Sequence, residues 1–229
     1  MIQDTSSKLS PLSLIQERLG ARFSELAGWR IPEAYSDTAS EKNAAENALV
    51  LVDDTPNGKL TVEGNDAGYV LKTVLKVHAT GIGEGEAIPE GMVYRMRSDH
   101  YFISTSPGSE SDIRKRLAEG SGPRFVTVTD MTHGWSEIRV LGAASPELMA
   151  KVCGLDLGDF PSRTARQTSV AKTNQLVVRT LVGGMHAFSL LGARSLAAYL
   201  WEVLMEAGEE WGMIPAGNKA VRELVAKGE

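Results

Sequence analysis

The chain has 229 residues, of which 42% are hydrophobic and 23% are charged, and its formal net charge is −5. This is the composition of an ordinary globular protein, long enough for one large domain or two small ones. Because acidic residues outnumber basic ones, no positive surplus is available to neutralise phosphates, and nucleic acid is not expected as the main partner. A local basic pocket for an anionic ligand stays open.

Nothing in the sequence predicts export or membrane insertion. The first twenty residues, MIQDTSSKLSPLSLIQERLG, lack the positively charged start and apolar core of a secretory signal. No run reaches the roughly 18 apolar residues that a membrane helix needs. The single cysteine, Cys153, cannot form an internal disulfide, and its apolar neighbours predict a small core residue rather than a reactive thiol. We therefore expect a cytoplasmic protein with no membrane partner.

The first quarter of the chain predicts two helices and a strand. Ser10 and Pro11 form a helix-start signature, followed by apolar residues at helical spacing. Pro32 excludes a regular helix over residues 28–35. Residues 36–54 open with Ser and Asp, continue Ala-rich as a helix and end in the strand-like run LVLVDD.

Residues 57–106 predict a turn, a strand, a helix and a hairpin. The Asn57-Gly58 pair predicts a tight turn before the alternating strand KLTVEG, and a helix begins at Asn65-Asp66. The glycine-rich stretch 79–87 has no following lysine and leads into a strand, so it predicts a flexible turn rather than a phosphate loop. The runs GMVYRM and HYFISTS predict a β-hairpin over residues 91–106.

The rest of the chain continues the alternation of helices and strands. A helix with acids first and bases later covers residues 108–120, Ser145 is the expected cap of another, and Trp201 is an expected core residue on the last long helix. Strands and helices alternate with antiparallel hairpins, which predicts an α+β fold. Two halves, roughly 12–120 and 121–229, each carry a strand–helix–strand rhythm consistent with an internal duplication.

Catalytic and metal motifs are scarce. The four histidines share no helical i, i+4 spacing and no cysteine cluster, so no metal site is expected. No G-x-S-x-G nucleophile elbow is present, and the acids are too scattered for spacing alone to identify an acid–base pair. Periodicity alone therefore leads to an α+β protein with a Gly-rich acidic turn.

The order of five stretches resembles the glycine-cleavage T-protein (aminomethyltransferase) family, which includes tetrahydrofolate-dependent demethylases and the folate domains of sarcosine and dimethylglycine oxidases. The stretches cover nearly the whole chain: residues 20–35, 41–71, 91–106, 130–149 and 200–224. The resemblance implies two similar α+β halves around a central folate channel. It also implies that the chain is the folate-binding region alone, lacking the C-terminal β-rich domain of full-length relatives.

The sequence departs from the family pattern at three expected folate contacts. Two adjacent aspartates of relatives, one of which holds the folate amine, correspond to Pro89 and Glu90. A glutamate that pairs with the pterin ring corresponds to Gly184, and an arginine that meets the folate tail corresponds to Val225. Because buried pterin donors without partners cost about 1–3 kcal/mol each, these departures bear directly on folate binding.

The resemblance implies tetrahydrofolate-dependent transfer of a methyl or methylene group, either by the chain alone or as a subunit. Glu90 is the expected catalytic carboxylate, because it keeps an acid at the family's aspartate position. Tyr94 and Arg95 are expected to line the folate channel, and Tyr35 and Trp135 to stack on the pterin.

A second function stays open. Residues 153–179 resemble the γ subunit of heterotetrameric sarcosine oxidase, which has the same fold without being the catalytic folate site. The altered contacts favour a non-catalytic subunit that supports a partner oxidase or methyltransferase. This alternative predicts an exposed apolar patch, whereas the enzyme predicts a deep channel with convergent polar groups.

Overall fold

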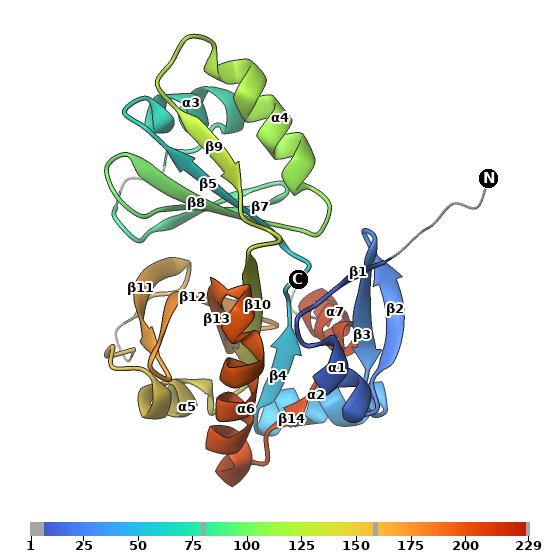
Figure 1. The fold of residues 1–229 in the computed structure, drawn as a ribbon. Helices are drawn as coiled ribbons and strands as arrows, with labels where there is room; N and C mark the ends of the chain where they lie inside the picture. The colour runs from blue at the N-terminus through green and yellow to red at the C-terminus, as the bar shows by residue number, and fades with distance from the viewer. Residues whose placement is uncertain (1–6, 79–80, 158–159, 228–229) are drawn as a thin grey trace, which may run out of the picture.

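A computed structural model describes residues 7–78, 81–157 and 160–227 and arranges them in two lobes (Figure 1). The upper lobe in that view holds residues 58–130, and the lower lobe holds the segments before and after them. None of the helices in these ranges is long and apolar enough to cross a membrane.

The upper lobe is a five-stranded sheet with two helices packed on one face. The strand order is β6-β7-β8-β5-β9, and every neighbouring pair is antiparallel. Apolar side chains of alternate strand positions meet those of the helices in one buried cluster. The elements are β5 (Gly58–Glu63), α3 (Ala67–Leu75), β6 (Gly85–Ile88), β7 (Gly91–Arg95), β8 (His100–Thr105), α4 (Glu110–Ser121) and β9 (Thr127–Asp130).

The lower lobe contains a six-stranded sheet of order β11-β12-β13-β10-β4-β14 and a three-stranded sheet of order β1-β3-β2. Its strands are β1 (Lys8–Leu9), β2 (Arg22–Leu26), β3 (Trp29–Ala34), β4 (Val50–Asp53), β10 (Trp135–Leu141), β11 (Thr164–Val170), β12 (Thr173–Val182), β13 (Met185–Ala193) and β14 (Ile214–Pro215). Its α-helices are α1 (Ser13–Arg18), α2 (Thr38–Asn47), α5 (Ser145–Val152), α6 (Ala197–Gly208) and α7 (Asn218–Lys227).

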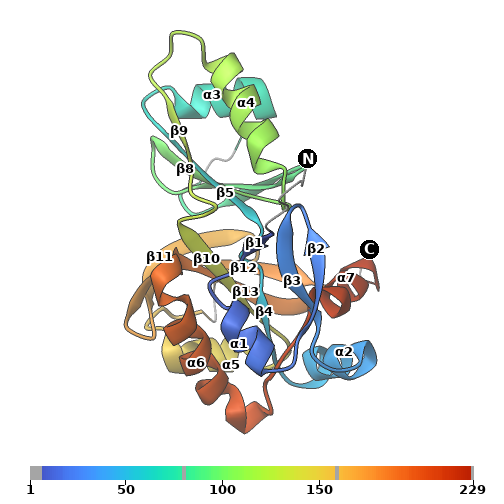
Figure 2. The same ribbon diagram turned by 45° about the vertical axis from the view of Figure 1, so that its right-hand side comes forward.

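The upper lobe is an insertion between two neighbouring strands of the lower lobe. β4 and β10 lie side by side and antiparallel in the six-stranded sheet, yet residues 58–130 separate them in the sequence. The chain therefore crosses between the lobes twice, at residues 54–57 and 131–134. The two crossing segments lie close together in space (Figure 2).

Most predicted elements form, and the mixed α+β class is confirmed. Asp37 caps α2 by accepting a hydrogen bond from the Ser40 amide at 2.9 Å. Trp201 and Cys153 are buried in the core of the lower lobe, as expected.

Three local predictions need correction. α1 begins at Ser13, and the Ser10 hydroxyl instead accepts from the amide of Leu12, so Ser10 orders the approach to the helix. α5 has Ala144 at its N-cap, while the Ser145 hydroxyl donates to the carbonyl of His186 on β13. The sequence predicts a flexible turn over the stretch 79–87, of which residues 79–80 lie outside the described ranges. From Gly85 onward this stretch forms β6, which pairs with β7.

The six-stranded sheet takes strands from both expected halves, and residue 121 is the last residue of α4. The sheets are assembled from residues 58–130 and from the remainder of the chain. An internal duplication with halves 12–120 and 121–229 stays a prediction.

Candidate functional site in the cleft between the lobes

The cleft lies between the upper-lobe sheet and the strands β10, β12 and β13 below it (Figure 1). Its middle is filled by three stacked aromatic side chains, Tyr94, Phe102 and Trp135, which we call the aromatic stack. Ring centroids are 6.4 Å apart for Tyr94 and Phe102 and 5.8 Å apart for Phe102 and Trp135. Apolar residues of the lower sheet pack against these rings, so the stack divides the cleft into two cavities.

The first cavity, which we call the polar end, has a volume of about 270 Å³. Tyr94 and the charged pair Glu137 and Arg139 line it, together with hydroxyl groups from both lobes. The serine and threonine residues among its lining are Ser104, Thr105, Ser106, Thr180 and Ser189.

Strand alternation positions the two charged side chains. Trp135, Glu137 and Arg139 occupy every second position of β10, so they share the face that looks toward the upper lobe. Ile138 and Val140, which point to the opposite face of β10, enter the core of the lower lobe. The upper lobe covers this face of β10, and Glu137 is therefore buried and Arg139 is mostly buried.

The charges of the polar end belong to a buried ionic cluster. Lys59 is completely buried, and its Nζ lies 3.3 Å from Oε2 of Glu137 while donating to the carbonyls of Thr55 and Asn57. Nε of Arg139 lies 2.7 Å from Oδ2 of Asp54. Buried charges are tolerated only when paired in this way, so each cation compensates a carboxylate.

Burial perturbs the acid–base behaviour of Asp54. The pKa of its carboxyl is raised to about 6, chiefly by loss of hydration; Arg139 and Lys59 oppose the rise, and the negative charges of Glu137 and Asp53 add to it.

Hydrogen bonds tie the two crossings together beside this cluster. The Asp54 amide donates to the Glu137 carbonyl at 2.9 Å, and the Glu137 amide donates to the Thr55 hydroxyl at 3.2 Å. The Lys59 amide donates to the hydroxyl of Thr132 at 3.0 Å. These bonds fix β10 relative to β5, so the polar end has a preformed geometry.

Glu90 lies on the turn between β6 and β7, next to Gly91, which lines the polar end. Its Oε1 lies 2.5 Å from Nη1 of Arg116, and its carbonyl accepts from the amide of Ser106. Its Oε2 is buried and has no hydrogen-bond partner among the described residues. One carboxylate oxygen is thus held by a cation, while the other keeps its acceptor capacity.

The second cavity, which we call the aromatic end, has a volume of about 560 Å³. Phe102 and Trp135 give it an apolar wall, and polar side chains line other parts of it. Nε2 of His100 lies 3.4 Å from Oε1 of Glu63. The cations Arg97 and Arg166 also line this end.

The structure brings only some of the predicted site residues together. Tyr94 lines the polar end, Glu90 stands beside it, and Trp135 lines the aromatic end. Arg95 is the last residue of β7 and lines neither cavity, and its carbonyl accepts a hydrogen bond from the Gly83 amide. Tyr35 lines neither cavity, and burial beside Asp53 and Glu41 raises the pKa of its hydroxyl. The folate roles of these residues stay predictions.

Sequence reasoning missed Lys59, Glu137 and Arg139. A signal was present, because a charge at alternate positions of an otherwise apolar strand marks one face as polar. That signal does not distinguish solvent from a buried ionic cluster. Within the described ranges, no group of three or more His, Cys, Asp or Glu side chains is arranged to hold a metal ion.

Comparisons with known proteins agree on the fold. The aminomethyltransferases of Saccharopolyspora erythraea and Mycobacterium avium are 28% and 29% identical over 225 and 219 residues, covering 93% and 90% of this chain. The chain spans 61% and 59% of the length of these relatives.

Two solved structures share this architecture. The glycine cleavage system aminomethyltransferase T from Bartonella henselae superposes with a TM-score of 0.86 at 20% identity, covering 96% of this chain and 62% of that one. A chain of the heterotetrameric sarcosine oxidase from Corynebacterium sp. U-96 gives 0.69 at 19% identity, covering 88% and 95%. The GCVT N-terminal domain family model matches residues 12–226, and the chain therefore belongs to this family, as its sequence pattern indicated.

Proposed function

We propose that the chain binds a reduced folate with its pterin ring at the polar end and takes part in one-carbon transfer. The observation that carries this proposal is Glu137, a carboxylate 2% exposed that lines a cavity between two lobes. Its Oε2 lies near Lys59 but has no hydrogen-bond partner among the described residues. A buried acceptor of this kind is complementary to a ligand donor.

The chemistry of a pterin suits this acceptor. The 2-amino group and the adjacent ring N–H form two parallel donors, much as a guanidinium does, and a carboxylate binds such a pair in a bidentate manner. Glu137 would thereby supply the acid that is absent at Gly184. The cavity of about 270 Å³ lies just below the usual range of roughly 300–1,000 Å³ for drug-sized ligands, so it suits a bicyclic ring rather than a whole folate.

Glu90 would act on the reacting amine of the folate. Arg116 fixes one of its oxygens, and Oε2 remains as an acceptor that could orient an N–H or take up its proton. Bound folate supplies the nucleophilic amine that accepts the one-carbon group. The protein supplies the orientation, the exclusion of water by the aromatic stack, and the carboxylate.

A second candidate is a non-catalytic subunit of an oxidase or methyltransferase complex. Two observations favour it: Glu90 is already paired with Arg116, and the middle of the cleft is filled by the aromatic stack. Under this candidate the buried ionic cluster holds the two lobes in position relative to each other and binds no ligand.

Equilibrium dialysis under anaerobic conditions separates the candidates. Tetrahydrofolate, a simple reduced pterin and p-aminobenzoylglutamate are tested side by side. The proposal expects the first two to be retained and the third to pass freely, because recognition is of the pterin. Tetrahydrofolate is then incubated with N-methyl amine donors, and methyl-tetrahydrofolate, the product of transferring the intact methyl group, is measured by mass spectrometry. Retention of none of the three ligands would favour the non-catalytic subunit.

A further inference from the structure

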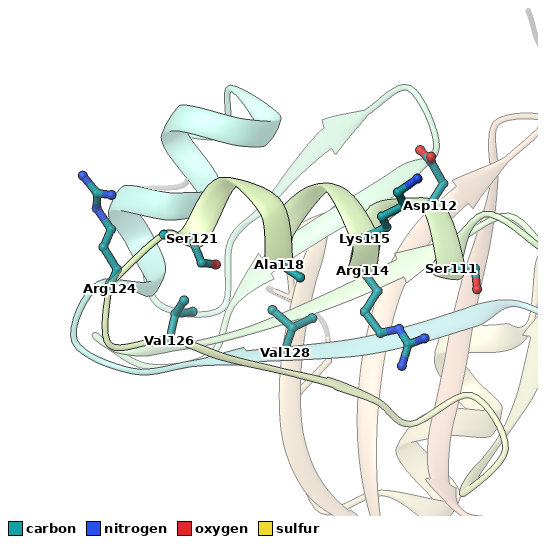
Figure 3. Close-up of a pocket in the computed structure, with 10 residues that line it drawn as sticks. Ser111, Asp112, Arg114, Lys115, Ala118, Ser121, Arg124, Val126 and Val128 are labelled. Carbon is teal, nitrogen blue, oxygen red and sulfur yellow. The ribbon is translucent and has the colours of Figure 1, made fainter.

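A second surface feature lies away from the cleft, on the outer side of the upper lobe. A groove of about 860 Å³ runs between α4 and the segment that leads into β9 (Figure 3). None of its lining residues lines either end of the cleft. Whatever this groove binds is therefore separate from a folate in the cleft.

Both walls of the groove follow from local periodicity. On α4, Ser111, Arg114, Ala118 and Ser121 recur at intervals of three or four residues, so they form one stripe along the helix. On the opposite wall Val126 and Val128 point toward α4, and Arg114 extends from the helix toward the strand (Figure 3). The groove thus has an apolar floor and polar edges.

The charge of the groove is opposite to that of the chain. Three cations line it, Arg114, Lys115 and Arg124, against a single acid, Asp112. That acid lies 3.6 Å from Arg116, so a neighbouring cation already offsets its charge. A local positive surplus on a chain of net charge −5 is complementary to an anionic ligand.

The backbone beside the groove offers an unpaired strand edge. β9 is the last strand of its sheet, and among the described strands it pairs only with β5. The Met131 amide donates to the Lys59 carbonyl, and antiparallel alternation then directs the backbone groups of Val128 away from β5. An extended peptide can add to such an edge through main-chain hydrogen bonds.

Exposed aromatic rings adjoin the same edge. Phe125 is 74% exposed, although its backbone is fixed by two hydrogen bonds with Asp66. The Arg124 guanidinium lies 4.1 Å from the ring centroid of Tyr69, which is also exposed. Exposed aromatic rings beside a cation are typical of the anchors of protein interfaces.

We propose that this groove docks an extended acidic segment of a partner protein. The segment pairs with the free edge of β9 and places its carboxylates against Arg114, Lys115 and Arg124. The apolar floor takes the alternate side chains, since successive residues of a strand point to opposite sides.

The proposal is tested by fluorescence anisotropy with the intact chain. The probe is a labelled peptide of about ten residues in which Glu and Val alternate. The test variant is Arg114→Glu with Lys115→Glu. The matched control is Lys219→Glu with Arg222→Glu, which makes the same change of net charge on exposed positions of α7. A second peptide is N-methylated at every residue, so neither of its edges can donate strand hydrogen bonds.

The expected result is saturable binding with a Kd on the order of 100 μM. The groove variant should weaken it at least tenfold, the α7 variant less than threefold, and N-methylation should abolish it. The proposal is overturned if the peptide does not bind, if both variants weaken it equally, or if a single-stranded oligonucleotide binds more tightly than the peptide.

Discussion

The two ends of the inter-lobe cleft are built from the same sheets but present different chemical groups. At the polar end, β10 presents Glu137 and Arg139 inside a buried ionic cluster. At the aromatic end, the same strand presents Trp135 against Phe102, and charged side chains line the same cavity. Among the described residues, the polar end combines preformed geometry with a buried carboxylate oxygen that is ion-paired but has no hydrogen-bond partner, and preorganisation of this kind favours specific binding.

The largest expected effect tests whether the charges of the polar end are interdependent. Lys59→Met leaves Glu137 without its cation and two carbonyls without a donor, so the free energy of unfolding should fall by about 3–5 kcal/mol. Urea denaturation measures it. Lys42→Met removes an exposed partner of Glu223 and should cost less than about 1 kcal/mol. Equal losses in the two variants would show that the cluster has no special role.

The next prediction concerns pH. Because the folded-state pKa of Asp54 is raised above its unfolded value, the folded protein binds this proton more tightly, and stability falls as pH rises from about 4 to about 6. Asp54→Asn removes the titration. The difference in unfolding free energy between wild type and variant should therefore decrease across that window by at most about 3 kcal/mol. A difference that is constant with pH would contradict the burial of an ionisable Asp54.

A third prediction compares the two ends as pterin sites. Glu137→Gln keeps the side-chain shape but removes the charge, so tetrahydrofolate affinity should fall about 10- to 100-fold. Trp135→Leu alters the aromatic end and should change the affinity less than about threefold. Titration of both folded variants measures this. The reverse order would place the pterin on Trp135.

The smallest expected effect concerns Glu90. Its ion pair with Arg116 is partly exposed, so Glu90→Gln should lower the unfolding free energy by only about 0.5–1 kcal/mol. Asp112 lies 3.6 Å from the same guanidinium, and Asp112→Asn should lower the unfolding free energy still less. Thermal unfolding of the two variants measures both. A much larger loss for Glu90→Gln would assign this carboxylate a structural role rather than one in the site.

Local sequence signals predicted most of the fold but little of the site. The signals that succeeded depend only on neighbouring residues. Asp37 caps α2, the alternating residues 59–63 lie in β5, and residues 91–106 contain the hairpin of β7 and β8. The burial of Lys59 and Glu137 depends on a long-range event, the insertion of one lobe between β4 and β10, which no local pattern encodes. Tyr35 lines neither cavity; it follows β3, which belongs to the separate three-stranded sheet.

The resemblance to T-protein-like sequences supplied the part of the site that local patterns could not. It selected Tyr94, which lines the polar end, and Glu90, which precedes the lining residue Gly91. It could not identify Glu137, because Glu137 stands on β10, whereas Gly184, the position matched to the acid of relatives, lies in the turn between β12 and β13.

The most direct test is anaerobic calorimetric titration of the wild-type chain and of Glu137→Gln with tetrahydrofolate. The account predicts micromolar binding to the wild type, about −8 kcal/mol, and at least tenfold weaker binding to the variant. Binding of equal strength to both proteins, or no binding to the wild type at millimolar ligand, would contradict a pterin site at Glu137.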